Sequence, residues 1–201
     1  MFDFKVGNMF NYKIGKFFSE EECLSIIKSL DNCDNLIITT EFGNLDLSVY
    51  EMGYENMDES VIKTTIGKRL DRFSKNIRRS LNETFFIKYY GDRNSMDYHY
   101  DGSHTTTLVY LNTDFKGGGT DFPLAGKTHV PQDFLPGHYI HYNSNSLLSY
   151  HGGLPVTEGA KYALVIRTQK INFLSFFTLL PFRLFRDGIL SRVLQYVVFN
   201  K

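Results

Sequence analysis

The sequence predicts an α+β fold in which helices come first and antiparallel strands of a jelly-roll kind follow. Residues 1–83 carry two amphipathic helical patterns. Residues 84–170 instead contain short runs of aromatic and β-branched residues, separated by Gly, Pro and Asn. Helices followed by strands are typical of α+β proteins, and short, regularly spaced strands favour a sandwich or barrel.

The first helix is expected to begin after Ser19. Ser19 followed by Glu22 forms a capping box ahead of an apolar pattern, because each residue can bond the other's backbone N–H. Phe17 and Phe18 lie directly before the cap and can pack as a hydrophobic staple. These four residues therefore predict where the first helix starts.

The second helix is expected over residues 62–81. Its apolar residues recur every three or four positions and form one stripe along a helix. The opposite face is basic and carries Lys68, Arg72, Lys75 and Arg79. A solvated surface is the simpler interpretation of this face, and binding of an anionic partner is the alternative.

Three segments downstream have the composition of strands. They are residues 84–90 (TFFIKYY), 105–111 (TTTLVYL) and 161–168 (KYALVIRT). Residues 117–119 are three glycines with no GK[ST] after them, so we interpret them as a tight turn and not as a phosphate loop. Pro136-Gly137 is a further turn, and HYIHY follows it.

Composition excludes several classes of protein. The chain has 201 residues, 22 basic and 22 acidic, so its formal net charge is zero. This balance excludes a strongly basic protein that coats nucleic acid and an acidic disordered tail. It has only two cysteines, Cys23 and Cys33, which argues against a disulfide framework and a cysteine-ligated zinc site. The first residues lack the pattern of a signal peptide. A reducing, cytoplasmic location is therefore expected.

The residues that suggest chemistry begin with His99 and Asp101. In an extended chain these two side chains face the same way, because residues two apart share one side of a strand. A second, distant histidine, His151, would complete two imidazoles and one carboxylate, a set that suits Fe(II). His99-x-Asp101 alone would be read as surface polar residues, but Lys161, ten residues after His151, supports a site. A lysine of this kind can bind a dicarboxylate.

These motifs resemble the iron(II)- and 2-oxoglutarate-dependent dioxygenases, specifically their prolyl 4-hydroxylase-like branch. The matching segments occur in the family's order over about residues 13–170. They are KIGKFFSEEECLSII, Tyr90-Gly91, the HxD at His99, TLVYLN followed by GGGTDFP, PGHYIHYN, and His151 with Lys161. The resemblance therefore rests on several moderately specific motifs in sequence.

The resemblance implies a fold, a reaction and a role for each matching residue. The fold would be a double-stranded β-helix backed by the N-terminal helices. His99, Asp101 and His151 would bind iron, Lys161 would pair with the far carboxylate of 2-oxoglutarate, and Tyr90 would donate its phenol to that cosubstrate. The enzyme would use O2, with ascorbate (vitamin C) as reductant, and would hydroxylate a C–H with release of succinate and CO2.

The role of Arg167 is left open. It lies six residues after Lys161, on the same side of one strand, and could neutralise 2-oxoglutarate, contact substrate or form a structural ion pair. Lys161 and Arg167, the two ends of KYALVIR, also resemble the Arg-x5-Arg pair on one strand of the nucleic-acid demethylases in this superfamily. This resemblance makes demethylation the alternative reaction. A non-catalytic jelly-roll binding module is the remaining alternative.

The substrate is left open as well. Only Gly102, Ser103 and His104 separate Asp101 from the next strand, whereas prolyl 4-hydroxylases usually have a long loop there. The resemblance thus implies a more open site, for a protein side chain or a small molecule.

We expect one dioxygenase domain over residues 1–170, with helical support over 1–83 and the jelly-roll core over 84–170. Residues 171–201 form an apolar, net basic C-terminal extension. This extension is too short and too charged to span a bilayer. Packing on its own domain or in a homodimer is the preferred interpretation, and contact with a membrane surface is the alternative.

Overall fold

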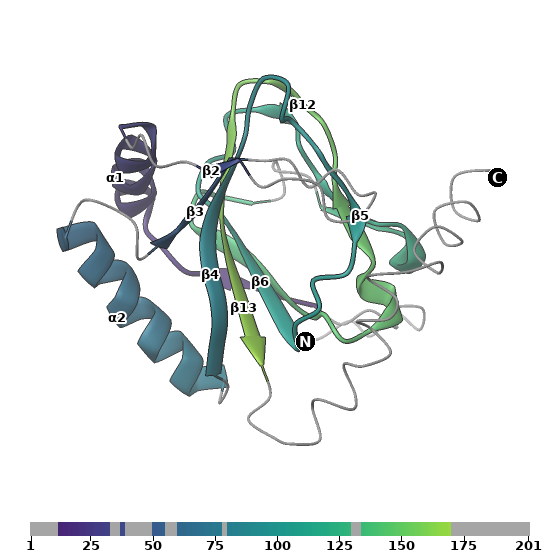
Figure 1. Cartoon of the computed structure of the whole chain (residues 1–201), viewed down its shortest axis with the longest axis horizontal. Helices are drawn as coiled ribbons and strands as arrows, with labels where there is room; N and C mark the ends of the chain where they lie inside the picture. Colours follow the sequence, from purple (N-terminus) through teal and green to yellow (C-terminus); the bar gives the residue numbers. More distant parts are fainter. Residues whose placement is uncertain are drawn as a thin grey trace.

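The computed structural model describes residues 12–32, 37–38, 50–54, 60–77, 80–129 and 134–169. Two helices, α1 (Glu20–Asp31) and α2 (Ser60–Ile77), accompany strands that pair antiparallel throughout (Figure 1). The predicted coarse architecture, a mostly antiparallel fold with two helices, is confirmed. The predicted extension at 171–201 and Arg79 lie outside the described residues.

The larger sheet has seven strands. In spatial order they are β1 (Tyr12–Lys16), β10 (His138–Asn143), β6 (Thr105–Tyr110), β13 (Lys161–Gln169), β4 (Ser80–Tyr89), β3 (Tyr50–Gly53) and β2 (Ile37–Ile38). The central pair β4–β13 aligns Tyr89 with Lys161 at one end and Glu83 with Arg167 at the other. This register fixes which side chains share the inner face of the sheet.

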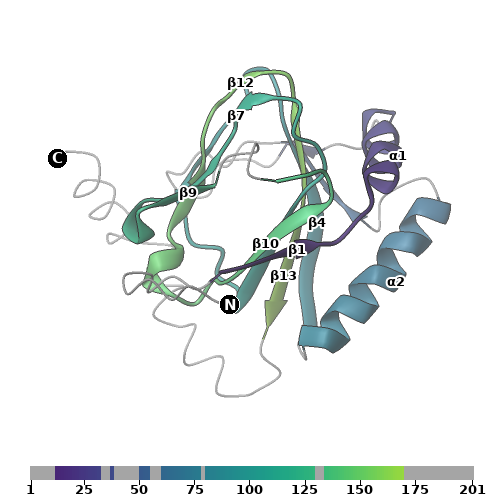
Figure 2. The ribbon, with the colours of Figure 1, turned by 180° about the vertical axis from the view of Figure 1, so that it is seen from behind.

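Two smaller sheets lie across from the larger one (Figures 1 and 2). The four-stranded sheet has the order β5 (Met96–His99), β11 (His151–Gly153), β8 (Thr120–Phe122), β9 (Lys127–His129), and the two-stranded sheet pairs β12 (Val156–Glu158) with β7 (Lys116–Gly117). Of two short 3-10 turns, η2 (Pro123–Ala125) connects β8 to β9, and η4 (Leu147–Ser149) lies between β10 of the larger sheet and β11. The arrangement resembles a jelly roll.

Successive side chains along the strands of the larger sheet point to opposite faces, and this separates two apolar clusters. On the outer face, Phe86 and Leu164 pack with residues of α1 and α2 such as Ile26 and Leu70. On the inner face, odd-numbered residues of β4 and β13 form the second cluster, which faces the smaller sheets. Both helices therefore cover the side of the larger sheet opposite to the interior between the sheets (Figure 2).

The predicted helix start is confirmed. The Ser19 side chain accepts a hydrogen bond from the backbone N–H of Glu22, and the Glu22 carboxylate accepts one from the N–H of Ser19. Phe17 and Phe18 are buried beside the cap. Local chemistry was sufficient here because all partners lie within a few residues of one another.

The second helix and the next strand differ from expectation at their junction. α2 ends at Ile77, and β4 already begins at Ser80, whereas the sequence pattern placed residues up to 81 in the helix. Ser80 pairs with Gln169 of β13, so pairing with a distant strand overrides the local pattern. Pairing also makes strands of Tyr12–Lys16 and Tyr50–Gly53, so the segment 1–83, which the sequence predicts as helical support, contains strands as well.

Neither described helix is long and apolar enough to cross a membrane.

Candidate metal centre and cosubstrate cavity

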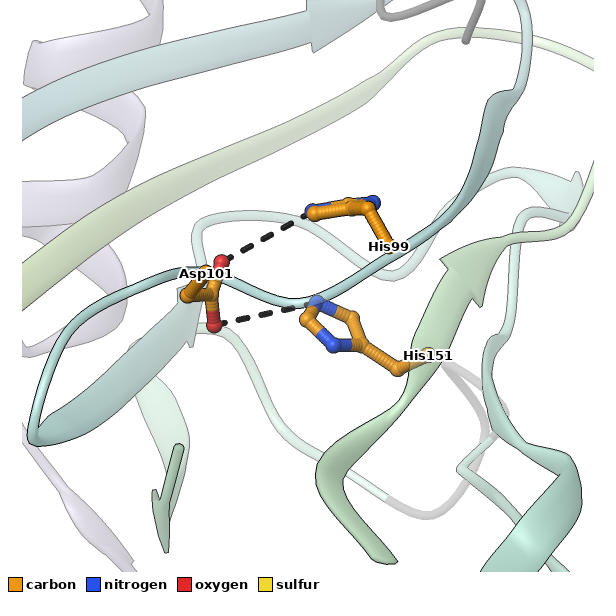
Figure 3. Close-up of side chains that lie close together, drawn as sticks. All are labelled: His99, Asp101 and His151. Carbon is orange, nitrogen blue, oxygen red and sulfur yellow. Dashed lines mark ion pairs between the residues drawn. The ribbon is translucent and has the colours of Figure 1, made fainter. Parts of the chain in front are cut away.

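The structure brings His99, Asp101 and His151 together between the larger and the four-stranded sheet. β5 ends at His99, and β11 begins at His151 directly across from it in an antiparallel pair. Asp101 follows on the same chain segment, while the hydroxyl of Tyr100 donates to the carbonyl of Leu147 instead. One ligand atom from each of the three residues lies within 4.8 Å of the other two (Figure 3). The predicted cluster therefore exists.

Both histidines are oriented by a backbone carbonyl two residues earlier. Nδ1 of His99 lies 2.7 Å from the carbonyl oxygen of Asp97, and Nδ1 of His151 lies 2.8 Å from that of Ser149. A carbonyl can only accept, so each Nδ1 carries the proton and each Nε2 keeps a lone pair. These Nε2 atoms lie 3.7 and 3.9 Å from the carboxylate oxygens of Asp101.

Burial sets the charges of this cluster. Desolvation lowers the pKa of His151 to about 4, so the imidazole is neutral at pH 7, as a metal ligand must be. Burial alone would raise the pKa of Asp101, but the neighbouring His151 and the Arg167 guanidinium hold it well below its usual range. The donor set is thus two imidazoles and one carboxylate, which fits a divalent metal such as Fe(II).

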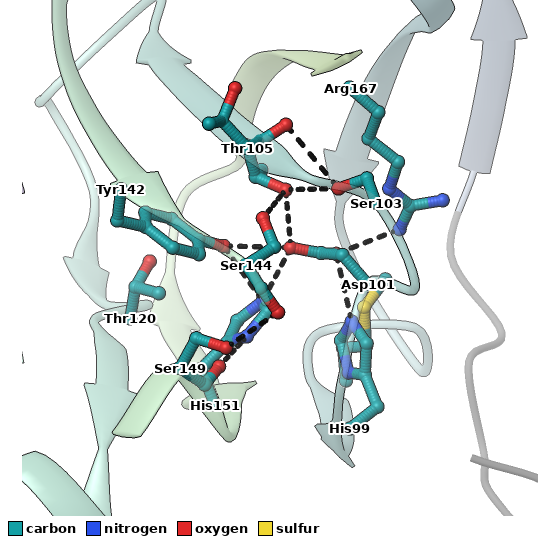
Figure 4. A network of polar contacts seen from close by, with 12 residues as sticks. His99, Asp101, Ser103, Thr105, Thr120, Tyr142, Ser144, Ser149, His151 and Arg167 are labelled. Carbon is teal, nitrogen blue, oxygen red and sulfur yellow. Dashed lines mark hydrogen bonds and ion pairs between the residues drawn. The ribbon is translucent and has the colours of Figure 1, made fainter. Parts of the chain in front are cut away.

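Asp101 is held by donors on both of its oxygens (Figure 4). Thr106 donates to Oδ2 at 2.6 Å, and the hydroxyl of Tyr142 donates to the same atom at 3.0 Å. Arg167 donates from Nη2 to Oδ1 at 2.9 Å. Because the Thr106 proton goes to Asp101, the Ser144 hydroxyl, 2.6 Å from Thr106, must be the donor in that second contact. The carboxylate is therefore fixed before any metal binds.

A cavity extends from the metal centre along the inner face of β4 and β13. Its enclosed volume is about 40 Å³. Its middle is apolar, while its polar groups lie toward the two ends of β13. The apolar wall consists of Phe85, Ile87, Met96, Leu108 and Val165.

Lys161 lies at the end of the cavity opposite to the metal centre. Its side chain is 1% exposed, and its ammonium donates to the carbonyl of Gly118 at 2.7 Å. The ammonium also lies over the rings of Tyr89 and Tyr110, 4.7 and 5.5 Å from their centroids. No carboxylate in the described ranges forms an ion pair with it. Desolvation therefore lowers its pKa to about 7.

Gly118 has the backbone conformation that this contact requires. Its φ is +65°, a left-handed value that residues with a Cβ rarely adopt. A Cβ at this position would also lie 2.6 Å from the ring of Phe115. The predicted tight turn at the three glycines thus supplies the carbonyl that faces Lys161.

The structure corrects the placement of Tyr90. Its side chain is 54% exposed and packs beside Lys88 on the surface, so it does not line the cavity. Tyr89, which is 3% exposed, lines the cavity directly across from Lys161. Adjacent residues of a strand face opposite ways, so an assignment that is off by one position exchanges the inner and the outer residue.

Arg167 lines the same cavity as Lys161, as their six-residue spacing predicts. It lies at the metal end, where it forms ion pairs with Asp101 and, at 3.0 Å, with Glu83. Its Nε is buried and has no hydrogen-bond partner among the described atoms. The structural ion pair that the sequence left open is therefore present, and the Nε–H of the guanidinium remains unused.

Comparisons with known proteins were made for the sequence and for the fold. No family model matches the sequence. A procollagen lysyl hydroxylase and glycosyltransferase of Acanthamoeba polyphaga mimivirus is 27% identical over 126 residues, which are 60% of this chain and 14% of that protein. A multifunctional procollagen lysine hydroxylase and glycosyltransferase of Rattus norvegicus is 29% identical over 129 residues, 60% of this chain and 17% of that protein. The chain thus spans less than a fifth of these curated relatives.

The fold matches solved prolyl hydroxylases. A viral collagen prolyl hydroxylase of Paramecium Bursaria Chlorella virus-1, solved with 2-oxoglutarate, gives a TM-score of 0.61 at 19% identity and covers 84% of this chain and 100% of its own. A Pseudomonas putida prolyl-4-hydroxylase gives 0.58 at 13% identity, covering 82% and 95%. A Trichoplax adhaerens prolyl hydroxylase, solved with a hypoxia inducible factor peptide, gives 0.58 at 15% identity, covering 82% and 84%.

The chain thus shares the fold of these solved hydroxylases, and it carries a buried cluster of two histidines and one aspartate that could hold a metal ion. This likeness to prolyl hydroxylase structures agrees with the resemblance that the sequence motifs carry.

Proposed function

We propose that this chain is an Fe(II)- and 2-oxoglutarate-dependent hydroxylase that oxidises a C–H of a protein side chain. The observation that carries the proposal is Lys161: a buried ammonium without a carboxylate partner in the described ranges, in one cavity with the His99, Asp101 and His151 cluster. An unpaired buried charge is costly, so a group that persists there has a ligand to bind. The carboxylate of a dicarboxylic acid is such a ligand.

His99, Asp101 and His151 would hold the iron. Fe(II) bound there would couple O2-dependent decarboxylation of 2-oxoglutarate to succinate and CO2 with hydroxylation of the substrate C–H. The chain's own residues do the rest. They orient the two imidazoles through backbone carbonyls, fix the carboxylate, and supply apolar walls that exclude water.

The cavity would bind 2-oxoglutarate lengthwise. Lys161 would pair with its far carboxylate, and Tyr89, not Tyr90, is the phenol positioned to assist at that end. At the metal end, the unused Nε–H of Arg167 could donate to an oxygen of the cosubstrate. In this proposal, the facing sheets are the two halves of the double-stranded β-helix that the resemblance implies.

A protein side chain is the substrate class we propose. The solved neighbours include a collagen prolyl hydroxylase and a prolyl hydroxylase with a bound peptide, and the curated relatives are named as procollagen lysyl hydroxylases. β6 begins at Thr105, so only residues 102–104 follow Asp101 before the next strand. This short connection favours an open approach to the metal centre. A small-molecule substrate remains the alternative.

Nucleic-acid demethylation is less well supported. The exposed basic residues of α2, Lys68, Arg72 and Lys75, belong to a helix that packs on the outer face of the larger sheet. The cavity opens on the inner face. A nucleic acid bound along α2 would therefore lie on the wrong side of the sheet to present a base to the metal centre.

The test is succinate release and substrate oxidation. Purified protein with Fe(II), ascorbate, O2 and 2-oxoglutarate should release succinate slowly, and faster with a peptide pool containing prolyl and lysyl residues. Mass spectrometry should find a peptide that gains one oxygen atom. His99→Ala should abolish both. Succinate release that persists in His99→Ala would refute the assignment of the metal ligands, and a wild-type protein that neither binds metal nor turns over would be a binding module.

A further inference from the structure

Arg167 connects the metal-binding carboxylate to the rim of the cavity. Its Nη2 donates to Oδ1 of Asp101 at 2.9 Å, and its Nη1 donates to Oε2 of Glu83 at 3.0 Å. The Asp101 side chain is 3% exposed, whereas that of Glu83 is 52% exposed. One guanidinium thus spans from a buried metal ligand to a carboxylate in contact with solvent.

The strand register fixes this arrangement. Arg167 of β13 lies directly across from Glu83 of β4, and both extend the inner row of residues that lines the cavity. The guanidinium also lies over the ring of Phe85, 5.0 Å from its centroid. An arginine has many rotamers, so contacts on three sides are needed to keep Nη2 directed at Asp101. Glu83 supplies the contact at the far end.

We propose that Glu83 and Arg167 form a clamp that positions the carboxylate of Asp101 for metal binding, with Glu83 acting only through Arg167. Thr106 and Tyr142 donate hydrogen bonds to Oδ2 of Asp101. Arg167 donates to the other oxygen, Oδ1, and thereby fixes its orientation. This inference rests on the proposed role of Asp101 as a metal ligand. Glu83 is therefore a positioning residue two contacts away from Asp101, the proposed metal ligand.

The experiment measures metal binding without turnover. Mn(II) affinity is determined by electron paramagnetic resonance for the wild type, Glu83→Ala, Arg167→Met and the double variant. Loss of a group that supports a metal ligand typically weakens metal binding about 10- to 100-fold. We expect about 10-fold or more for Arg167→Met and a smaller loss, about threefold to tenfold, for Glu83→Ala.

The double variant tests the order of action. If Glu83 acts only through Arg167, the double variant binds Mn(II) no more weakly than Arg167→Met alone. The absorption spectrum of the Co(II)-loaded protein should shift in both single variants, because the carboxylate changes its orientation. A purely structural role would not alter that spectrum. Glu83 is exposed, so Glu83→Ala should fold even where Arg167→Met does not.

Glu158 provides the matched control. It is an exposed strand carboxylate paired with Lys116, outside the cavity, and Glu158→Gln should leave Mn(II) affinity and the Co(II) spectrum unchanged. Wild-type affinity in Glu83→Ala, or losses that add up in the double variant, would overturn the clamp alone. A wild-type protein that binds neither Mn(II) nor Co(II) would overturn the proposed function together with the clamp.

Discussion

Strand β13 places one cationic side chain toward each end of the cavity, and the surroundings of these two side chains are opposite. Lys161, at the end opposite to the metal centre, is buried without a carboxylate partner in the described part of the chain. Arg167, six residues along β13, pairs with Asp101 and Glu83. The difference indicates different roles: the paired cation positions a neighbouring side chain, whereas the unpaired one is available to a ligand.

Replacing the unpaired cation should have the largest effect. Lys161→Met should raise the KM for 2-oxoglutarate about 100-fold or more, because removing one partner of a buried ion pair costs about 3–5 kcal/mol. Steady-state succinate release at increasing 2-oxoglutarate concentrations measures this change. Lys116→Met, which removes an exposed lysine, should leave the KM unchanged. Equal KM values in the two variants would contradict the role of Lys161.

The affinity for 2-oxoglutarate should also depend on pH. Burial lowers the pKa of Lys161 to about 7, and only its protonated form attracts a carboxylate. Above pH 7, affinity should therefore fall about tenfold per pH unit, and the fall should be absent in Lys161→Met. Calorimetric titration from pH 6 to 9 checks this. An affinity that is constant over that range would show that the ammonium does not titrate there.

The same unpaired charge should reduce the stability of the ligand-free protein. The folded-state pKa of Lys161 lies below its unfolded value, so unfolding takes up a proton between about pH 7 and pH 10. The free energy of unfolding should rise with pH across that window by about 1 kcal/mol per unit from this residue. Urea unfolding at several pH values measures it. Lys161→Met should remove this rise, and an unchanged slope in that variant would assign it to another group.

The smallest expected effect comes from comparing two adjacent tyrosines of the segment that faces Lys161, Tyr89 and Tyr90. Tyr89→Phe should raise the KM for 2-oxoglutarate by about threefold to tenfold, the value of one hydrogen bond, since Tyr89 lines the cavity. Tyr90→Phe should leave the KM unchanged, since Tyr90 lies on the surface. The opposite result would restore the sequence-based assignment of Tyr90.

Sequence was sufficient where chemistry depends on short spacings. The capping box at Ser19, the two-residue spacing of His99 and Asp101, and the six-residue spacing of Lys161 and Arg167 all follow from local periodicity. His151 required the family's order of motifs, because nothing local indicates which distant histidine joins the pair.

Register between distant strands was not accessible from sequence. Whether Tyr89 or Tyr90 faces inward depends on how β4 aligns with β13, and so does the pairing of Arg167 with Glu83. Tyr142 of β10 donates a hydrogen bond to Asp101, which is 41 residues away in the sequence. No sequence motif predicts this contact. The domain limits, the cytoplasmic location and the role of residues 171–201 stay predictions.

The most direct test is whether 2-oxoglutarate needs both ends of the cavity. Anaerobic calorimetric titration of the Fe(II)-loaded wild type should give one bound 2-oxoglutarate per chain. Either Asp101→Ala or Lys161→Met should weaken that binding about 100-fold or more, each through its own end. Binding of wild-type strength in both variants, or no binding to the wild type with Fe(II) present, would contradict the account.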